Sequence, residues 1–246
     1  MRNLKFIISF NGSRYHGFQR QAFHQTIQGE IENALSKILN ESVKITGCSR
    51  TDAGVHARSF CFNAFIGGNI PDENLVRAMN GFLPGDIAVL SCESAGVDFN
   101  ARFSAKGKEY VYLINNKKRR DVFMQGLAYH YPYKMDLNIM REAAGMFIGE
   151  HDFAAFCRSE GKKEVNSTIR EIISFNVTEK EGFVEFIVQG SGFLYNMMRI
   201  MAGTLIYISE GKRNMFDIEE AFRTGDREKA GKTLPPYGLY LNKVFY

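Results

Sequence analysis

The chain contains 246 residues, of which 45% are hydrophobic and 24% are charged, and its formal net charge is +4. This composition excludes a disordered chain and fits one large or two ordinary globular domains, while the mild positive charge permits a polyanionic partner. The apolar stretch at residues 6–10 is too short for a membrane span or a secretory signal, and the four cysteines have no CxxC spacing. We therefore expect a cytoplasmic protein with reduced thiols and no membrane association.

Hydrophobic periodicity and turn residues predict a β-α-β-β-α-β succession over the first hundred residues. The expected elements are strand 4–10, helix 27–39 with Thr26 as its N-cap, strands 43–46 and 59–65, helix 71–79 and strand 87–91. This order suits helices packed on one face of a mainly antiparallel sheet, with the opposite face left for a ligand.

The second half of the chain repeats this theme loosely. Its expected elements are strand 110–114, helix 136–147, strands 169–178 and 183–188, helices 194–208 and 217–223, and a final strand 239–244. The predicted fold class is α+β, in two halves that pack closely because no long linker separates them. We expect a domain boundary after residue 103, giving domains 1–103 and 104–246.

The segment that joins two predicted strands of the first half carries the strongest chemical signal. It reads Arg50-Thr51-Asp52-Ala53-Gly54-Val55-His56-Ala57. The charge of Arg50 would favour the ionised form of Asp52, and the small residues that follow leave room for another molecule to approach. An ionised carboxylate with open access suits a nucleophile or general base, whereas the alternative is a turn aspartate that binds backbone N–H groups.

Residues 47–57 closely resemble the active-site signature of the TruA family of tRNA pseudouridine synthases. Further matches to that family run along nearly the whole chain, at residues 15–21 with 26–28, residues 101–105 with Tyr110, residues 192–199, and residues 233–236 with 238–239. Cys48 and Ser49 stand where many members carry Ala-Gly. Because both are small, we expect catalysis to be kept, with Cys48 adding sensitivity to thiol reagents.

The resemblance implies a role for each candidate site residue. Asp52 is the expected catalytic residue, and Arg50, Tyr110 and Arg199 are the expected substrate-binding residues. Tyr110 would stack on or touch the target base, which is worth about 1–3 kcal/mol, and Arg199 would pair with Asp52. Without the resemblance, Tyr110 would be a packed strand tyrosine and Arg199 an arginine that extends from a helix edge toward water.

The resemblance also implies the reaction and the fold. The expected enzyme is a tRNA pseudouridine(38–40) synthase, a homodimeric isomerase acting on uridines 38, 39 and 40 of the tRNA anticodon stem–loop. The target base must be flipped out, and the exchange of an N1–C1′ for a C5–C1′ bond calls for no cofactor and no metal. Two RRM-like or ferredoxin-like halves, joined side by side, would form an RNA-binding cleft opposite their helices. Whether Asp52 attacks the ribose, attacks the base or removes a proton stays open.

Basic residues provide a possible path for the RNA backbone. They are the run Lys117-Lys118-Arg119-Arg120 and the scattered Arg14, Arg20, Arg58, Lys106, Lys108, Arg158, Lys162 and Lys163. Each alone is an ordinary surface charge, but together they could follow phosphates and make affinity depend on salt. His56 is expected to be packed or hydrogen-bonded, and His151 with Asp152 is a weak metal site because no further ligand stands nearby.

Two other classes of function fit part of the sequence. A non-catalytic RNA-binding module would account for the strand and helix order, the aromatic residues and the basic loops. It would not account for a carboxylate at Asp52 inside an RNA-binding groove. The other class, a small-molecule or metal-dependent hydrolase, lacks ligand spacing.

Overall fold

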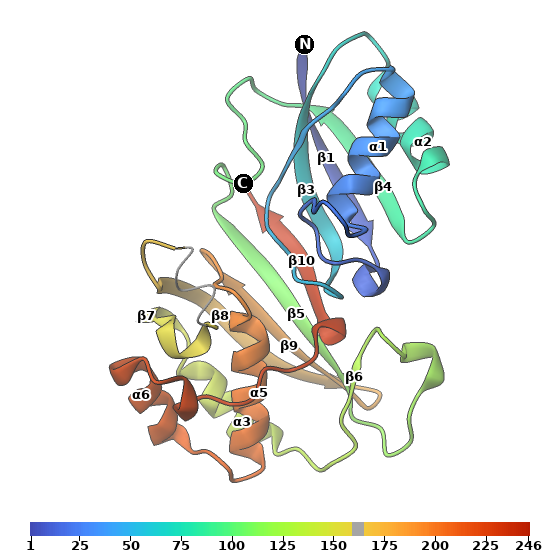
Figure 1. Ribbon diagram of the computed structural model, residues 1–246. Coiled ribbons are helices and arrows are strands. Elements are labelled where there is room, and N and C mark those ends of the chain that lie inside the picture. The colour runs from blue at the N-terminus through green and yellow to red at the C-terminus, as the bar shows by residue number, and fades with distance from the viewer. Residues whose placement is uncertain (159–164) are drawn as a thin grey trace. The chain divides into compact units, whose positions relative to one another are not determined.

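The computed structural model describes residues 1–158 and 165–246. The chain forms two compact units, unit 1 with residues Met1–Lys106 and Tyr240–Tyr246, and unit 2 with residues Gly107–Leu239 (Figure 1). The C-terminal residues thus pack in the same unit as the N-terminal strand, whereas the sequence placed them with the second half. The domain boundary after residue 103 stays a prediction.

Unit 1 contains a twisted sheet in the order β4-β1-β3-β10. Its strands are β1 (Arg2–Phe10), β3 (His56–Ile66), β4 (Ile87–Ser94) and β10 (Leu239–Phe245), with the short β2 (Ile45–Gly47) paired to β3. The pairings are antiparallel except that β10 runs parallel to β3. Helices α1 (Ile27–Leu39) and α2 (Asp72–Phe82) pack against each other and against β2 and β4 respectively.

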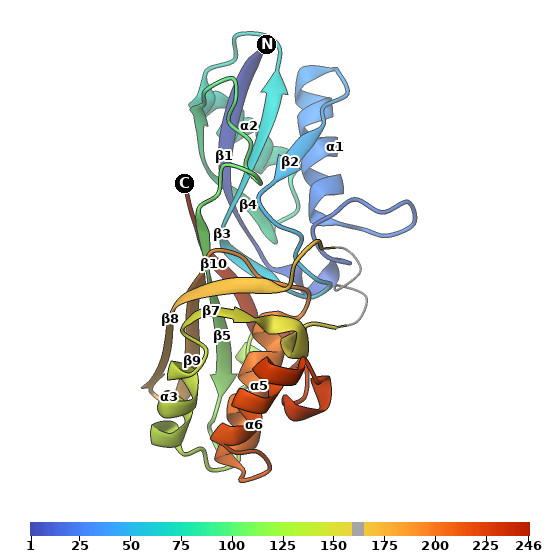
Figure 2. The same ribbon diagram turned by 90° about the vertical axis from the view of Figure 1, so that its left-hand side faces the viewer.

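Unit 2 contains an antiparallel sheet in the order β5-β9-β8-β7. Its strands are β5 (Gly107–Asn115), β7 (Gly149–Asp152), β8 (Ile169–Lys180) and β9 (Phe183–Gly190), with β6 (Tyr129–His130) paired parallel to β5. The helices are α3 (Leu137–Gly145), α5 (Met197–Ser209) and α6 (Met215–Thr224). Because α3 packs on β8, α5 packs on β5 and the two helices contact each other, they cover one face of this sheet (Figure 2).

Local sequence explains where the first helices begin. The Oγ1 atom of Thr26 accepts the Gly29 N–H at 3.2 Å, and Ile27, Ile31 and Leu35 face the core at helical spacing. The Asp136 carboxylate caps α3 in the same way, accepting two backbone N–H groups. The Thr26 cap and the α+β class with mainly antiparallel pairing are therefore confirmed.

Several details differ from the sequence-based expectations, among them two helix starts and one strand pairing. Helix α5 starts at Met197 rather than residue 194, because Asn196 has a left-handed backbone conformation with φ of 62°. Helix α6 starts at Met215 rather than 217, because Asn214 forms a capping box with Asp217. The third difference is the parallel pairing of the final strand with β3.

Aromatic residues fill the cores of both units, as expected for most of them. Phe6 and Phe62 stack at a centroid distance of 4.6 Å in unit 1. In unit 2 the rings of Phe147, Phe156 and Phe222 contact one another. Among the described residues, the helices are all too short or too polar to cross a membrane.

Candidate active site

Asp52 lies in the loop of residues 48–55, which connects β2 to β3 in unit 1. The loop leaves β2 through a hydrogen bond from the Cys48 N–H to the Cys61 carbonyl at 2.9 Å. It turns back on itself where the Val55 N–H donates to the Asp52 carbonyl at 3.2 Å, and Gly54 provides the positive φ of 78°. The backbone of Asp52 is therefore part of a closed turn.

The segment of residues 12–18 forms backbone hydrogen bonds with this loop. The Gly54 N–H donates to the Tyr15 carbonyl at 3.2 Å, and the Phe18 N–H donates to the Thr51 carbonyl at 3.2 Å. At Gly17 the backbone has a φ of 87°, and a Cβ atom would lie 2.5 Å from the Thr51 carbonyl oxygen. Glycine is thus required where the two segments touch, which the sequence reasoning did not recognise.

Within this loop the candidate residues differ in accessibility. Asp52 is half-buried, Arg50 is exposed and Thr51 is buried. The structure thus brings Asp52 and Arg50 together in one loop of unit 1. A half-buried carboxylate on a fixed backbone can meet a substrate without first ordering its loop, which reduces the entropy cost of positioning.

His56 is a packed residue, as the sequence predicted. It is 1% exposed, its Nδ1 atom accepts the Gly12 N–H at 3.0 Å, and its ring stacks on Tyr240 at 4.7 Å. The guanidinium of Arg58 lies over the Tyr240 ring, 4.9 Å from its centre. His56 thus ties residue 12, the end of the Asp52 loop and strand β10 together.

Cysteine chemistry differs from the expectation for Cys48. All four cysteines are described residues and lie outside disulfide bonds, as predicted, but Cys48 is 0% exposed. Burial raises the pKa of Cys61 to about 11 and that of Cys92 to about 12, so these thiols are poor nucleophiles at neutral pH. The predicted sensitivity of the site to thiol reagents at Cys48 is therefore wrong, since the reagent cannot reach the sulfur in the folded chain.

Tyr110 lies in β5 of unit 2, opposite Val188 of β9. Its side chain is 6% exposed, and the ring meets Phe193 edge-on at a centroid distance of 4.8 Å. Phe193 belongs to the segment of residues 191–196 that connects β9 to α5. The contact with a base remains a prediction.

Arg199 lies in the first turn of α5 and is half-buried. Its Nε atom donates to the Leu234 carbonyl at 2.7 Å, and its Nη1 atom donates to Oδ1 of Asn196. In return, the Leu234 N–H donates to the Arg199 carbonyl at 3.2 Å. Protein oxygens therefore hold the guanidinium, in contrast to an arginine that extends from the helix edge into water.

The segment of residues 230–235, called the strap, packs against helix α5 in unit 2. The Gly231 N–H donates to Oγ1 of Thr204 at 2.8 Å, and a Cβ atom on Gly203 would lie 1.8 Å from the Lys232 carbonyl oxygen. Two backbones thus touch at Gly203 and Gly231. Glycine inside an otherwise apolar helix was the available sequence signal for this contact, and it was missed.

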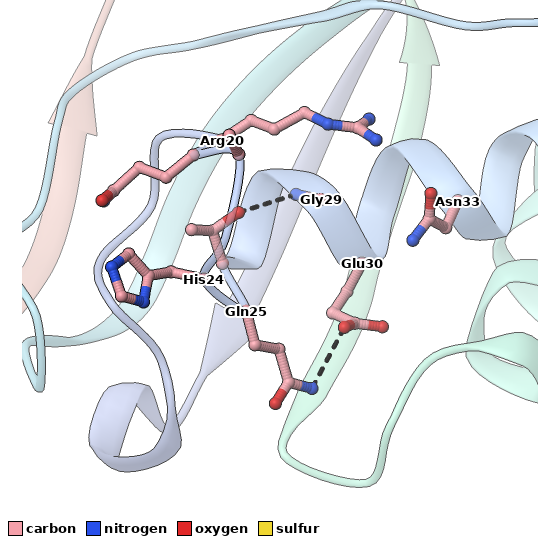
Figure 3. Close-up of a pocket in the computed structure, with 9 residues that line it drawn as sticks. Arg20, His24, Gln25, Gly29, Glu30 and Asn33 are labelled. Atoms are coloured by element: carbon pink, nitrogen blue, oxygen red, sulfur yellow. Dashed lines mark hydrogen bonds between the residues drawn. The ribbon is translucent and has the colours of Figure 1, made fainter.

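A polar cavity of about 420 Å³ opens near the start of α1 (Figure 3). It is lined by Arg20, Gln21, Ala22, His24, Gln25, Thr26, Gly29, Glu30 and Asn33. Figure 3 shows the Gln25 amide donating to the Glu30 carboxylate, and Arg20 pairs with Glu32 at 2.7 Å. Arg20 and Glu30 are thus both engaged by neighbouring side chains, and neither Arg50 nor Asp52 lines the cavity.

The other basic and histidine candidates lie outside the loop of residues 48–55. Residues 117–120 are exposed, and the Nζ atom of Lys117 lies over the Phe183 ring, 4.6 Å from its centre. Lys162 and Lys163 lie outside the described residues. The His151 ring stacks on Phe222 at 4.4 Å, and across the described residues no group of three or more His, Cys, Asp or Glu side chains could hold a metal ion.

Comparison with known proteins places this fold and loop in a class. A family model described as tRNA pseudouridine synthase matches residues 6–104 and 143–246. The tRNA pseudouridine synthase A of Caldicellulosiruptor bescii is 43% identical over 246 residues, and that of Ruminiclostridium cellulolyticum is 44% identical over 247 residues. A tRNA pseudouridine synthase A 2 of Clostridium perfringens is 40% identical over 246 residues, and in all three cases both chains are covered completely. The chain therefore belongs to the TruA family, as its motifs predicted.

Proposed function

We propose that this protein isomerises uridine to pseudouridine at positions 38, 39 and 40 in the anticodon stem–loop of tRNA, with Asp52 as the catalytic residue. Family membership supports the reaction and the tRNA substrate. The observation that supports Asp52 is its loop, which carries the family signature and is bonded to the segment of residues 12–18 on both sides of the carboxylate.

The chemistry requires a carboxylate, a support for the base and a dry pocket. Asp52 acts on the ribose, on the base or on a proton while the N1–C1′ bond breaks. Tyr110 supports the extruded base. Arg50 and Arg199 bind the substrate, and Arg199 also pairs with the Asp52 carboxylate. Confinement keeps the cleaved base close to the ribose so that C5 meets C1′.

The partners of this reaction follow from the same proposal. The enzyme acts in the cytoplasm as a homodimer that reads the shape of the stem–loop, since neighbouring uridines with different sequence contexts are all substrates. Exposed basic residues such as those at 117–120 contribute phosphate contacts, so binding weakens as salt rises.

Tritium release tests the function directly. Unmodified tRNA carrying tritium at uridine C5 is incubated with the protein, without added cofactor, and released tritium is counted. We expect release by the wild-type protein, none by Asp52→Ala, and unchanged tRNA binding by that variant. Asp98→Ala, which removes an exposed carboxylate from the same unit, is the matched control and should keep full activity.

Two outcomes would contradict the proposal in different ways. Tight tRNA binding without tritium release by the wild-type protein would identify a non-catalytic RNA-binding module. Appreciable turnover by Asp52→Ala would leave the reaction in place and remove Asp52 from its role.

A further inference from the structure

Asn196 directly precedes α5 and departs from the usual helix start. Its backbone is left-handed, with φ of 62° and ψ of 5°, a conformation that asparagine adopts more readily than most residues. An ordinary N-cap residue is extended and binds a backbone N–H with its side chain, but Asn196 makes no such bond. Its carboxamide therefore serves another purpose.

The orientation of this carboxamide is fixed by Arg199. The Oδ1 atom accepts a hydrogen bond from Nη1 of Arg199. Because a guanidinium only donates, the oxygen must face Arg199 and the nitrogen must point away from it. Asn196 is 6% exposed, and its Nδ2 atom is buried with no hydrogen-bond acceptor among the described residues.

An orphaned buried N–H group requires an explanation, because such groups are paired almost everywhere in native proteins. The surroundings of Asn196 supply one. The segment of residues 191–196 carries Phe193 against the Tyr110 ring at one end and Asn196 against Arg199 at the other. The orphaned donor thus lies in the segment that contacts both Tyr110 and Arg199, the two residues of unit 2 proposed to act on uridine.

We propose that Nδ2 of Asn196 donates a hydrogen bond to a carbonyl oxygen of the target uracil. The inference rests on the proposed function. When the N1–C1′ bond breaks heterolytically, its electron pair stays with uracil, and the negative charge spreads over O2 and O4. C5 then bonds to C1′ and loses its proton while N1 gains one, so the product is an isomer.

A buried, preoriented donor is most useful while that charge exists. The hydrogen bond strengthens as the carbonyl oxygen becomes negative, so its effect falls on the rate of the chemical step more than on tRNA affinity. If the Asn196 side chain merely positioned Arg199, it would act through its oxygen alone. The two roles use opposite ends of one side chain and can be separated.

Two substitutions at this position separate them. Asn196→Asp keeps an oxygen for Arg199 but replaces the donor by a second acceptor. Asn196→Gly keeps the left-handed backbone and removes both groups. A donor to uracil predicts the rate order Asn, then Gly, then Asp. A role limited to holding Arg199 predicts that Asp equals Asn and exceeds Gly.

The measurement is single-turnover tritium release at saturating tRNA, with the tRNA dissociation constant and thermal unfolding recorded for each variant. We expect Asn196→Asp to lose about 100-fold in rate, the usual effect of removing one donor to a developing oxyanion, with nearly unchanged affinity. A rate close to wild type, or a loss confined to affinity, would overturn the inference. Release by the wild-type protein is required first, so failure of the proposed function is seen separately.

Modified substrates identify the oxygen. Sulfur is a weaker hydrogen-bond acceptor than oxygen, so tRNA with 2-thiouridine or 4-thiouridine at the target position weakens one contact at a time. The ratio of wild-type to Asn196→Gly rates should shrink toward one for the thio group that Asn196 contacts. An unchanged ratio with both substrates would exclude a contact to uracil carbonyls.

Discussion

At the residue scale, Gly17 lets the segment of residues 12–18 approach the loop that carries Asp52. Replacement by alanine faces two obstacles, a φ of 87° and a Cβ atom 2.5 Å from the Thr51 carbonyl oxygen. Left-handed backbone costs an ordinary residue roughly 1–2 kcal/mol, and the clash must also move the loop. We expect Gly17→Ala to stay folded but to lose at least about tenfold in single-turnover rate, because a small displacement of a catalytic group is costly.

Gly68 provides the matched control for this prediction. It has a similar φ of 76° in the same unit, but a Cβ atom there would meet nothing within 4 Å. Gly68→Ala should therefore show the stability loss without the rate loss. Equal rates for both variants in the tritium assay would mean that Gly17 does not position Asp52.

The proposed site residues could be predicted from sequence to different degrees. Asp52 and Arg50 share a short motif, so their common loop was evident from local sequence. The residues that fix this loop, Gly12 and Gly17, come from about forty positions upstream, and no periodicity connects them to it. Asn196 was inside a recognised motif, but its orphaned Nδ2 atom depends on side-chain geometry that sequence does not encode.

At the element scale, helix α5 depends on a close backbone crossing. Ala at position 203 would place Cβ 1.8 Å from the Lys232 carbonyl oxygen, so the strap of residues 230–235 must move. We expect Gly203→Ala to lose about 1–3 kcal/mol of unfolding free energy. We also expect slower catalysis, because the strap contains Leu234, whose carbonyl accepts a hydrogen bond from Arg199. Urea unfolding and single-turnover rates measure the two effects.

A glycine in another helix gives the opposite expectation. Gly81 lies in α2, and a Cβ atom there would meet nothing within 4 Å. Gly81→Ala should leave the rate unchanged and stabilise unit 1 by up to about 1 kcal/mol, because alanine favours helix. If Gly203→Ala behaved like Gly81→Ala, the crossing would not be tight in solution.

The C-terminal end of α5 gives a prediction about acid stability. Burial raises the pKa of Glu210, but hydrogen bonds from Lys212 and from the Tyr131 hydroxyl outweigh it, and the pKa is lowered overall. A lowered folded-state pKa stabilises the protein above the unfolded value of about 4.3, and this stabilisation disappears as the pH falls through the folded-state pKa. Glu210→Gln should therefore be less stable than wild type at pH 7, and the difference should shrink at about pH 3.5.

Urea unfolding at both pH values checks this expectation. Glu219→Gln is the control, because Glu219 is an exposed carboxylate in the neighbouring helix α6. Its substitution removes no buried contact, so its unfolding free energy at pH 7 should stay close to that of wild type. A Glu210→Gln difference that stayed constant with pH would mean that the ionised carboxylate contributes nothing through its hydrogen bonds.

Most elements followed from local sequence, and the exceptions have physical causes. Thr26 is a cap whose effect is complete within one helical turn, so it was predicted correctly. The start of α5 was misplaced because Leu194 continues the apolar period of that helix, while the left-handed Asn196 interrupts it. Apolar spacing alone could not distinguish a packed lead-in from the first turn.

At the scale of the whole molecule, the C-terminal strand pairs with a strand from the first part of the chain. Strand β10 pairs parallel with β3 through Tyr240 opposite His56 and Leu241 opposite Ala57. The Lys106 N–H donates to the Phe245 carbonyl at 2.8 Å, and the Tyr246 hydroxyl donates to the Ala101 carbonyl at 2.8 Å. Sequence reasoning kept β10 with the second half because no local pattern encodes a partner so distant in sequence.

Unit 1 should therefore not fold well without the C-terminal residues. A fragment of residues 1–106 leaves the β3 edge unpaired beside His56 and exposes the side that Leu241 covers, since Leu241 is 0% exposed in the intact chain. Joining residues 240–246 to this fragment should restore cooperative unfolding. Because Lys106 lies beside Phe245, the linker must run back along β10 for about 17 Å, which about 12 Gly/Ser residues can span.

Urea unfolding followed by circular dichroism compares the two fragments. We expect the joined fragment to unfold in one transition at higher urea than the fragment of residues 1–106. A joined fragment with Leu241→Ala controls for the added length, and its midpoint should fall between the other two, since the change removes a buried side chain worth about 2–5 kcal/mol. If the fragment of residues 1–106 unfolded at the same urea concentration as the joined one, β10 would be an accessory strand, and the link from His56 through Tyr240 would not support the Asp52 loop.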